Sequence, residues 1–508
     1  MPGVDPRPRP YHVATMTPDR QFRSPVRHFW RWLIPALLLW AFALQGTRGL
    51  WSPDEGRYVD VALEMLKSGD WLRPHVNAEF AHVTKPPLTY WAVASSVELF
   101  GRHEWAARLP HALAFALSVL LVGAMGRRLV PERPWLPALV YATFVLPYVA
   151  AHVITTDTLL AFFTTAYAAA FVEARARRDS RGAGGYVAAG WAAAGLAFLA
   201  KGPPGLLPLA GLALFAWSER RIVGPTLYLS WSGLLLFVVL GFGWYLRVAF
   251  DQPDLVRYFL VDEFWNRLSS PQSHRNADAI GAVRVYGGTL LLGTLPWTWP
   301  LLRDLSRSLR RPSALPLAWR ADPLSRLLAC WILVPLVVFV LARSRLPFYL
   351  LPLFAPLALV AARAVGAWSN RRVALLALAG AIGLLALRAF GALVVRPEDD
   401  RALARAIAAL PVSRIDEVAF VNTAPRYGLA FYLDAEVERL SLDDDPPAAQ
   451  RPPARGEVPL REGCRILLVE ARSAAALRSN LATGVGSYRR IGAAGRYTAY
   501  VVPGGGCD

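Results

Sequence analysis

Long apolar stretches alternate with short polar gaps between residues 29 and 395. About eleven such stretches occur, and each has roughly the 18–22 residues that an α-helix needs to cross a ~30 Å hydrocarbon core. This pattern predicts an all-α polytopic membrane domain with about 11 or more transmembrane helices. The stretches lie near residues 30–47, 106–126, 134–151, 157–174, 185–200, 203–217, 226–247, 284–302, 325–342, 346–363 and 372–394.

Arginines gather in every second polar gap, and this regularity predicts which way the helices run. Cytoplasmic loops hold the excess of Lys and Arg, so the basic segment 1–28 is expected in the cytoplasm. With the first apolar stretch it resembles an uncleaved signal anchor. The loops 48–105 and 250–283 and the C-terminal segment are then expected on the outer face. The basic gaps are residues 127–133, 175–181, 220–221, 303–320 and 363–372.

The composition agrees with a membrane protein and argues against a nucleic-acid-binding one. Hydrophobic residues make up 55% of the 508 residues and charged residues 18%, whereas soluble proteins have about a quarter charged residues. The net charge of +18 comes from loop clusters of arginine and not from one soluble face. Of the three cysteines, Cys330 lies in an apolar stretch, so at most one disulfide, Cys464 to Cys507, is expected.

Residues 396–508 differ from the region before them, because acidic residues return and long apolar runs stop. Runs rich in β-branched and aromatic residues predict strands, and two Ala/Leu-rich runs predict helices. We therefore expect a small extracytoplasmic, periplasmic α/β domain at 396–508, after a transmembrane domain at 29–395. The expected strands are 417–421, 465–470 and 497–502, the expected helices 401–410 and 474–481, and the expected surface loop 443–455.

Polar motifs gather in the outer loops. Residues 54–58 read D-E-G-R-Y, residues 68–71 read S-G-D-W, residues 85–91 read K-P-P-L-T-Y-W, and residues 104–110 read E-W-A-A-R-L-P. Unpaired charge near a bilayer is costly, so such a cluster indicates a functional site.

These motifs, in this order, resemble those of polytopic glycosyltransferases of the C-type superfamily that use a polyprenyl-phosphate sugar. The chain is most similar to the branch that contains the lipid A aminoarabinose transferases, and the protein O-mannosyltransferases are more distant relatives. The resemblance covers most of residues 45–360. It implies an inner-membrane enzyme that transfers a monosaccharide by direct displacement to lipid A or another envelope glycolipid on the outer face. Which sugar and which acceptor stay open.

The resemblance makes Asp54 the catalytic carboxylate, with Asp157 and Glu55 as further candidates that orient or deprotonate the acceptor. The simpler alternative makes Asp54 and Asp157 helix N-caps. The candidate ligands of the donor phosphate are Lys85, Arg57, Arg267 and Tyr349. Alternatives are a snorkelling Lys85 and a Tyr349 of the interfacial aromatic belt. For Lys201 in K-G-P-P, a structural or lipid-contacting role is as well supported as a catalytic one.

Metal dependence also stays open. His274 is the candidate metal ligand, although a lone His in a polar loop is usually only solvated. Many relatives have Glu where this chain has Thr84, so a family metal site is in doubt here. The sequence has no Walker or Rossmann glycine loop, which disfavours a nucleotide-sugar donor.

Three other functions compete with the glycolipid glycosyltransferase. The first is a protein O-mannosyltransferase-like enzyme. The second is a transporter or flippase of lipid-linked sugars, which is disfavoured because transporters bind substrate near the bilayer midplane and these motifs lie on one face. The third is a non-catalytic envelope assembly protein, against which the retention of Asp54, Lys85 and Tyr349 argues. Membrane lipids are the expected surroundings, and no nucleic-acid partner is expected.

Overall fold

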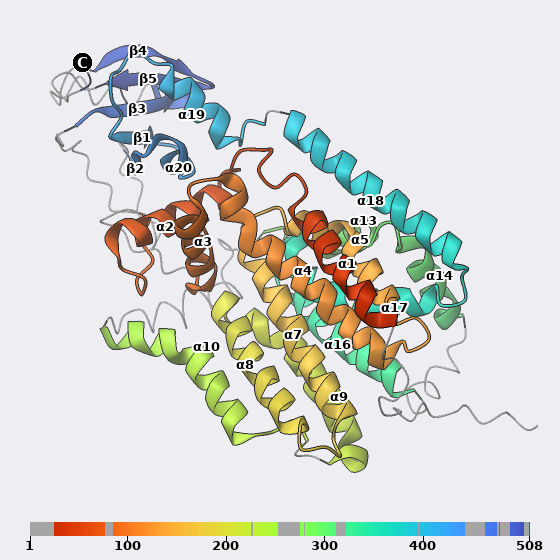
Figure 1. Cartoon of the computed structure of the whole chain (residues 1–508). Helices are drawn as coiled ribbons and strands as arrows, with labels where there is room; N and C mark the ends of the chain where they lie inside the picture. The colour runs from red at the N-terminus through yellow and green to blue at the C-terminus, as the bar shows by residue number, and fades with distance from the viewer. Residues whose placement is uncertain are drawn as a thin grey trace, which may run out of the picture.

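Helices built from the apolar stretches form the larger part of the molecule, and a small C-terminal sheet lies at one end (Figure 1). The computed structural model describes residues 25–76, 85–224, 227–251, 275–278, 280–310, 322–394, 396–441, 463–474, 477, 488–501 and 507. The helices before the sheet are α1 (Pro25–Phe42), α2 (Asp54–Ser68), α3 (Leu88–Phe100), α4 (Glu104–Leu129), α5 (Leu136–Thr143), α6 (Val145–Ala150), α7 (Thr156–Ala176), α8 (Ala183–Lys201), η1 (Pro203–Leu206), α9 (Leu207–Val223), α10 (Trp231–Asp251), η4 (Val283–Gly287), α13 (Gly288–Gly293), α14 (Thr298–Leu309), α16 (Pro323–Leu341), η6 (Pro347–Leu353), α17 (Phe354–Ala364) and α18 (Asn370–Leu393).

Within the described residues, seven helices are long and apolar enough to cross a membrane. They are α4, α7, α8, α10, α16, η6 continued by α17, and α18. Every predicted apolar stretch overlaps helical residues, so the helical, multi-pass class is confirmed. The remaining stretches form helices that are shorter, less apolar or interrupted, and a total of about eleven spans stays a prediction.

The third predicted stretch shows how the fold accommodates an interruption. Helix α5 ends at Thr143 and α6 begins at Val145, because Phe144 between them adopts an extended backbone. A break frees backbone groups that must find partners inside the protein. The Val145 amide donates to the Leu295 carbonyl at 3.3 Å, and Trp297 Nε1 donates to Thr143 Oγ1 at 2.8 Å. The segment between α13 and α14 therefore closes the break.

Glycines bring neighbouring membrane helices into close contact. A Cβ at Gly195 of α8 would lie 3.0 Å from the Phe237 carbonyl oxygen of α10. A Cβ at Gly211 of α9 would lie 2.4 Å from the Cys330 carbonyl oxygen of α16. Small residues allow such approach in lipid, where apolar burial gives helices little reason to associate. This packing holds α8, whose last residue is Lys201, firmly in the bundle.

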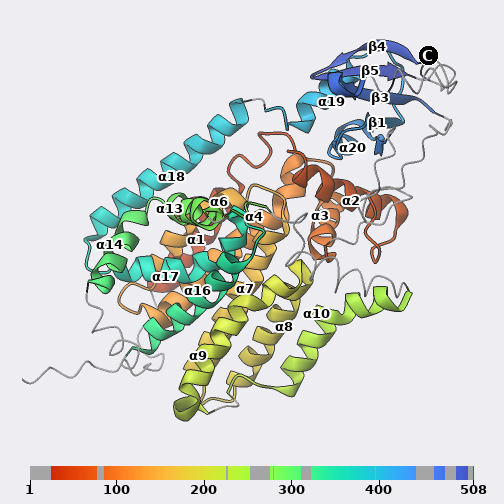
Figure 2. The ribbon, with the colours of Figure 1, turned by 180° about the vertical axis from the view of Figure 1, so that it is seen from behind.

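Helices α2 and α3 lie between the helical bundle and the C-terminal sheet in both views (Figures 1 and 2). The turn after α2 begins at Gly69, whose φ of 72° favours glycine. Two indole groups hold this turn. Trp91 of α3 donates to the Trp71 carbonyl at 2.6 Å, and Trp244 of α10 donates to the Leu72 carbonyl at 2.8 Å. The turn after α2 is therefore fastened to α3 and to α10 and is not left as a free loop.

The C-terminal part contains a mixed five-stranded sheet in the order β2-β1-β3-β5-β4. Strand β1 is parallel to β2 and β3, and β5 is antiparallel to β3 and β4. The three predicted strands are confirmed, whereas β2 and β4 were not predicted because charged residues and small residues outnumber the strand-forming ones in E-V-E-R-L and R-R-I-G-A-A. The predicted helix 401–410 is confirmed as α19, and 443–455 lies outside the described residues. The elements are α19 (Asp400–Ala408), β1 (Glu417–Val421), α20 (Leu429–Leu433), β2 (Glu436–Leu440), β3 (Arg465–Glu470), η7 (Ala471–Ser473), β4 (Arg489–Ala494) and β5 (Tyr497–Val501).

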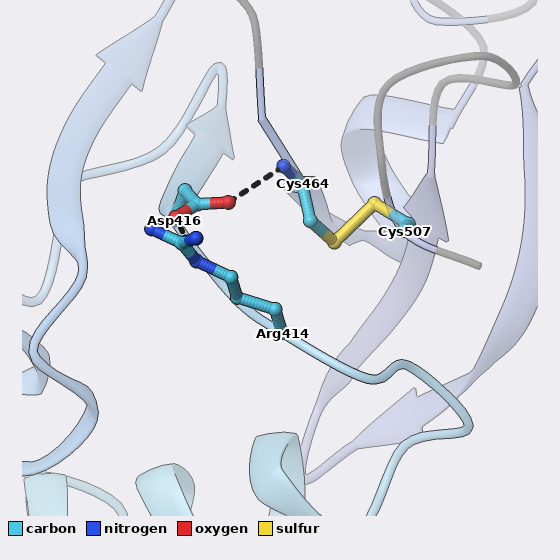
Figure 3. The surroundings of a disulfide bond; sticks show 4 residues. All are labelled: Arg414, Asp416, Cys464 and Cys507. Carbon is cyan, nitrogen blue, oxygen red and sulfur yellow. Dashed lines mark hydrogen bonds and ion pairs between the residues drawn. A yellow bond between two sulfur atoms is a disulfide. The ribbon is translucent and has the colours of Figure 1, made fainter.

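A disulfide joins Cys464, next to β3, to Cys507 (Figure 3). Asp416 supports it, because its Oδ2 accepts from the Cys464 amide at 2.9 Å while Arg414 pairs with the same carboxylate at 2.6 Å. The remaining cysteine, Cys330, is buried and free in α16. The single expected disulfide is therefore present.

Candidate active site

Asp54 is the first residue of α2 and is open to solvent. Its side chain is 62% exposed, and its Oδ1 accepts from the Arg57 guanidinium at 2.8 Å. Pro53 holds the N-cap position without any side-chain capping bond, so the alternative that Asp54 is the N-cap is wrong. The negative charge suits the positive end of the helix. Asp54 therefore has a carboxylate with room for a further partner.

Glu55, the next residue, is enclosed. It is 1% exposed and accepts from Arg48 at 2.5 Å and from Arg108 at 2.9 and 3.0 Å. The amides of Trp51 and Ile154 donate to it as well, at 3.0 and 3.1 Å. Burial raises the pKa of Glu55, but Arg108 and Arg48 outweigh burial and hold the pKa well below its usual range. With its lone pairs occupied, Glu55 has the surroundings of a structural residue.

Asp157 lies at the start of α7 and forms a buried ion pair with Lys201, the last residue of α8. The two side chains are 9% and 10% exposed, and Nζ lies 2.5 Å from Oδ1. The N-cap is Thr155, whose hydroxyl accepts from the Asp157 amide at 2.9 Å, so the alternative that Asp157 is the N-cap is wrong. Lys201 also lies over the Tyr349 ring, 4.4 Å from its centroid. Three residues from separate segments of the sequence therefore meet here.

Tyr58 connects this ion pair to Asp54. It is buried on α2, hydrogen-bonds Thr156, and interacts electrostatically with Asp54 and Asp157. Burial raises the pKa of Tyr58 to about 12, so the phenol keeps its proton at neutral pH and can donate it in a hydrogen bond. Sequence reasoning missed Tyr58 as a site residue. It closes the D-E-x-R-Y motif one helical turn after Asp54, and this spacing could have pointed to it.

Lys85 precedes α3 and is half-buried. Three residues later, Leu88 packs against Ala200 and Leu199 near the end of α8. This places the loop that bears Lys85 beside the helix end that bears Lys201. The other predicted ligands, Arg267 and His274, lie outside the described residues.

The described part of the chain contains no group of three or more His, Cys, Asp or Glu that could hold a metal ion. The cations that pair with Asp54 and Asp157 are Arg57 and Lys201. Such a set suits an anionic phosphate better than a metal ion. Arg108 belongs to the E-x-x-A-R-L-P motif, and the sequence suggested no role for it. In the structure it forms an ion pair with Glu55.

The fold and site can now be compared with known proteins. Residues 84–245 match the family described as dolichyl-phosphate-mannose-protein mannosyltransferase. The chain is 33% identical to the undecaprenyl phosphate-alpha-4-amino-4-deoxy-L-arabinose arabinosyl transferase 2 of Pseudomonas fluorescens, over 66% of this chain and 60% of that protein. It is 32% identical to the corresponding transferase of Edwardsiella ictaluri, over 62% of this chain and 55% of that protein. The chain thus spans about 60% or less of the length of these curated relatives.

A solved structure extends the comparison. The structure of ArnT from Cupriavidus metallidurans bound to undecaprenyl phosphate superposes with a TM-score of 0.72 and 22% identity, covering 93% of this chain and 98% of that one. The apo form of the same protein gives a TM-score of 0.73. This likeness shows a shared fold. The resemblance to the aminoarabinose transferases that the motifs predicted is therefore confirmed.

Proposed function

We propose that this protein is a glycosyltransferase of the C-type superfamily that transfers 4-amino-4-deoxy-L-arabinose from undecaprenyl phosphate to lipid A. The donor follows from the names of the relatives, and lipid A is the envelope acceptor that the motif resemblance implies. The relatives and the one-sided site favour transfer over transport of a lipid-linked sugar. Protein O-mannosyl transfer has weaker support, because it rests on the family match to residues 84–245 alone.

One observation carries the proposal: residues from four distant segments form a site that contains a solvent-open carboxylate and a buried Asp–Lys ion pair beside a tyrosine. Asp54 comes from α2, Asp157 from α7, Lys201 from α8 and Tyr349 from η6. Tyr58 links the first two of these electrostatically. A carboxylate for the acceptor and cations for a leaving phosphate are what sugar transfer from a lipid phosphate requires.

The reaction that we propose is a single displacement with inversion. The acceptor oxygen attacks the anomeric carbon, the bond from that carbon to the phosphate oxygen breaks, and undecaprenyl phosphate leaves with the electron pair. Asp54 takes the proton of a hydroxyl acceptor, or only positions an acceptor that is already an anionic phosphate. Lys85 and Arg57 stabilise the leaving phosphate, and Arg267 joins them from the 250–283 loop. Tyr349 offers its phenol to the same phosphate.

The remaining site candidates take supporting roles in this proposal. Asp157 is neutralised by Lys201 and is thus a positioning group, because its charge already has a buried partner. Glu55 holds the scaffold below Asp54. A divalent metal stays outside the proposed mechanism.

We further propose an eleven-span inner-membrane topology, with residues 1–28 in the cytoplasm and the domain at 396–508 in the periplasm. The Cys464–Cys507 disulfide supports the outer placement, because disulfides persist in oxidising compartments. Cysteine-labelling reporters test this arrangement. Positions 178 and 310 should report cytoplasm and positions 68 and 456 the periplasm. A cytoplasmic position 456 would remove one span from the proposed count.

Transfer itself is tested with purified protein, undecaprenyl-phosphate aminoarabinose and lipid A, with mass spectrometry of the product. We expect the mass of one aminoarabinose residue to be added to lipid A. Lys85→Ala should lower both donor affinity and turnover several-fold while the protein still inserts. If lipid A gains no mass, and another envelope lipid is modified in cells that carry the protein, then that lipid is the acceptor and lipid A is not.

A further inference from the structure

The C-terminal domain forms hydrogen bonds with residues 50–52, which precede Asp54. The Ser52 amide donates to the Glu398 carbonyl at 3.0 Å, and the Asp400 amide donates to the Leu50 carbonyl at 2.9 Å. In addition, Tyr432 Oη accepts from the Leu50 amide at 2.8 Å. Residues 50–52 are therefore held by three backbone hydrogen bonds to residues more than 340 positions away in the chain.

Asp400 makes the central contacts between the C-terminal domain and residues 50–52. It is fully buried, and its carboxylate accepts from Ser52 Oγ at 2.9 and 2.8 Å and from Arg426 Nε at 2.7 Å. Ser52 lies two residues before Asp54, so this hydroxyl is a direct link from the C-terminal domain to the catalytic segment. Arg426 is anchored in turn by the Pro397 carbonyl at 2.7 Å.

Close backbone packing makes this link rigid. A Cβ at Gly56 in the first turn of α2 would lie 2.5 Å from the Gly428 amide nitrogen and 2.8 Å from Asp400 Oδ2. A Cβ at Gly428 would lie 2.0 Å from the same oxygen. Neither glycine needs an unusual φ, so the absence of a side chain serves contact here. The first turn of α2 therefore rests directly on the buried carboxylate.

We propose that Asp400 is a positioning residue for sugar transfer, acting through the Ser52 hydroxyl to fix the orientation in which Asp54 meets the substrates. The C-terminal domain is on this basis a part of the active-site framework. Glu55 secures the same segment from the membrane side, so Asp54 stands between two buried anchors. This inference rests on the proposed transferase function and adds to it a role for a domain that carries none of the predicted catalytic residues.

The test uses Ser52→Ala in the whole chain. This substitution removes the hydrogen bond from the Ser52 hydroxyl to Asp400 and leaves the Asp400–Arg426 pair intact. We expect a fall of about tenfold in kcat with little change in KM for the donor, since small misplacements of a catalytic group reduce turnover strongly. Ser52→Thr keeps a hydroxyl and should restore most of the activity. Arg102→Ala is the matched control, because it breaks an exposed ion pair with Asp434 across the same two parts of the chain. It should leave kcat unchanged.

A second measurement separates positioning from loss of folded protein. In an Asp54→Asn background, Ser52→Ala should cause no further fall in kcat, because there is no longer a carboxylate to position. Asp400→Ala should reproduce the loss of Ser52→Ala, and the double variant should be no worse than Asp400→Ala alone. Equal tenfold losses in the wild-type and Asp54→Asn backgrounds would overturn the proposal and make the link purely structural.

The outcomes also distinguish the two proposals. Wild-type protein that transfers no sugar from the undecaprenyl-phosphate donor contradicts the proposed function. Wild-type protein that transfers sugar, with Ser52→Ala equally active, contradicts only the positioning role of Asp400.

Discussion

Two adjacent carboxylates at the start of α2 lie in opposite surroundings. Glu55 is 1% exposed and receives hydrogen bonds from two arginines and two backbone amides. Asp54 has a side chain that is 62% exposed, and among the described residues it pairs with Arg57. Consecutive helical residues point about 100° apart, so one turn of helix presents one carboxylate to the core and the other to the site. The buried carboxylate is saturated, whereas the open one can still bind a substrate.

The two acids of this motif therefore have different roles. The region around Glu55 holds two cations and one anion, and its stability depends on all three being present. Asp54 can still accept hydrogen bonds from a substrate, and its function depends on how its carboxylate is positioned. Changes at Glu55 should therefore affect folding first, and changes at Asp54 should affect turnover first.

The largest effect is expected for Glu55→Gln. Two buried guanidinium groups lose their counter-charge, and breaking a buried ion pair in this way costs about 3–5 kcal/mol. Thermal unfolding in detergent should show a strongly lowered midpoint or no folded protein. Asp54→Asn is the control and should unfold like the wild type. A stable but inactive Glu55→Gln protein would instead give Glu55 the catalytic role that its surroundings argue against.

Asp54→Asn should give the next largest effect, on turnover alone. Loss of a general base lowers turnover by ~10²-fold or more, and donor binding should be largely intact because the neighbouring cations remain. Product formation by mass spectrometry and donor binding by competition measure the two quantities separately. Normal turnover in Asp54→Asn would pass the catalytic role to Asp157.

The sequence predicted the larger features because they follow from local rules. A membrane crossing requires a long apolar run, and outer loops are short of arginine clusters, so α4, α7 and α8 could be placed within a few residues. The sequence could not show that Glu55 is buried and Asp54 exposed. This difference depends on the position of Arg108, which lies on another helix more than 50 residues away. The pairing of Asp157 with Lys201 and the link from Ser52 to Asp400 depend in the same way on tertiary packing.

A smaller effect separates two roles of Tyr349, which lies under Lys201. Tyr349→Phe keeps the ring and removes the hydroxyl, whereas Tyr349→Leu removes both. A cation–π contact contributes about 0.5–2 kcal/mol, so Tyr349→Leu should lower turnover by roughly tenfold. If the phenol also binds the donor phosphate, Tyr349→Phe should raise KM for the donor. Equal activity of the wild type and Tyr349→Leu would leave Tyr349 as an interfacial aromatic residue only.

The smallest expected effect is a pH dependence of stability that comes from Asp400. Burial raises the pKa of Asp400 to about 6, although Arg426 and the Ser52 hydroxyl favour the charged form, and Asp399 disfavours it. A carboxyl whose pKa is higher in the folded than in the unfolded chain stabilises the fold below pH ~4, and this contribution is lost as pH rises through about 6. Between pH 5 and pH 7 the loss should be roughly 1 kcal/mol. Unfolding midpoints of the wild type should therefore fall over this interval relative to those of Asp400→Asn, which lacks the titrating group. If the unfolding midpoints of the two proteins change with pH in parallel, Asp400 stays ionised beside Arg426 over the whole interval. Its hydrogen bond with Ser52 would then be independent of pH.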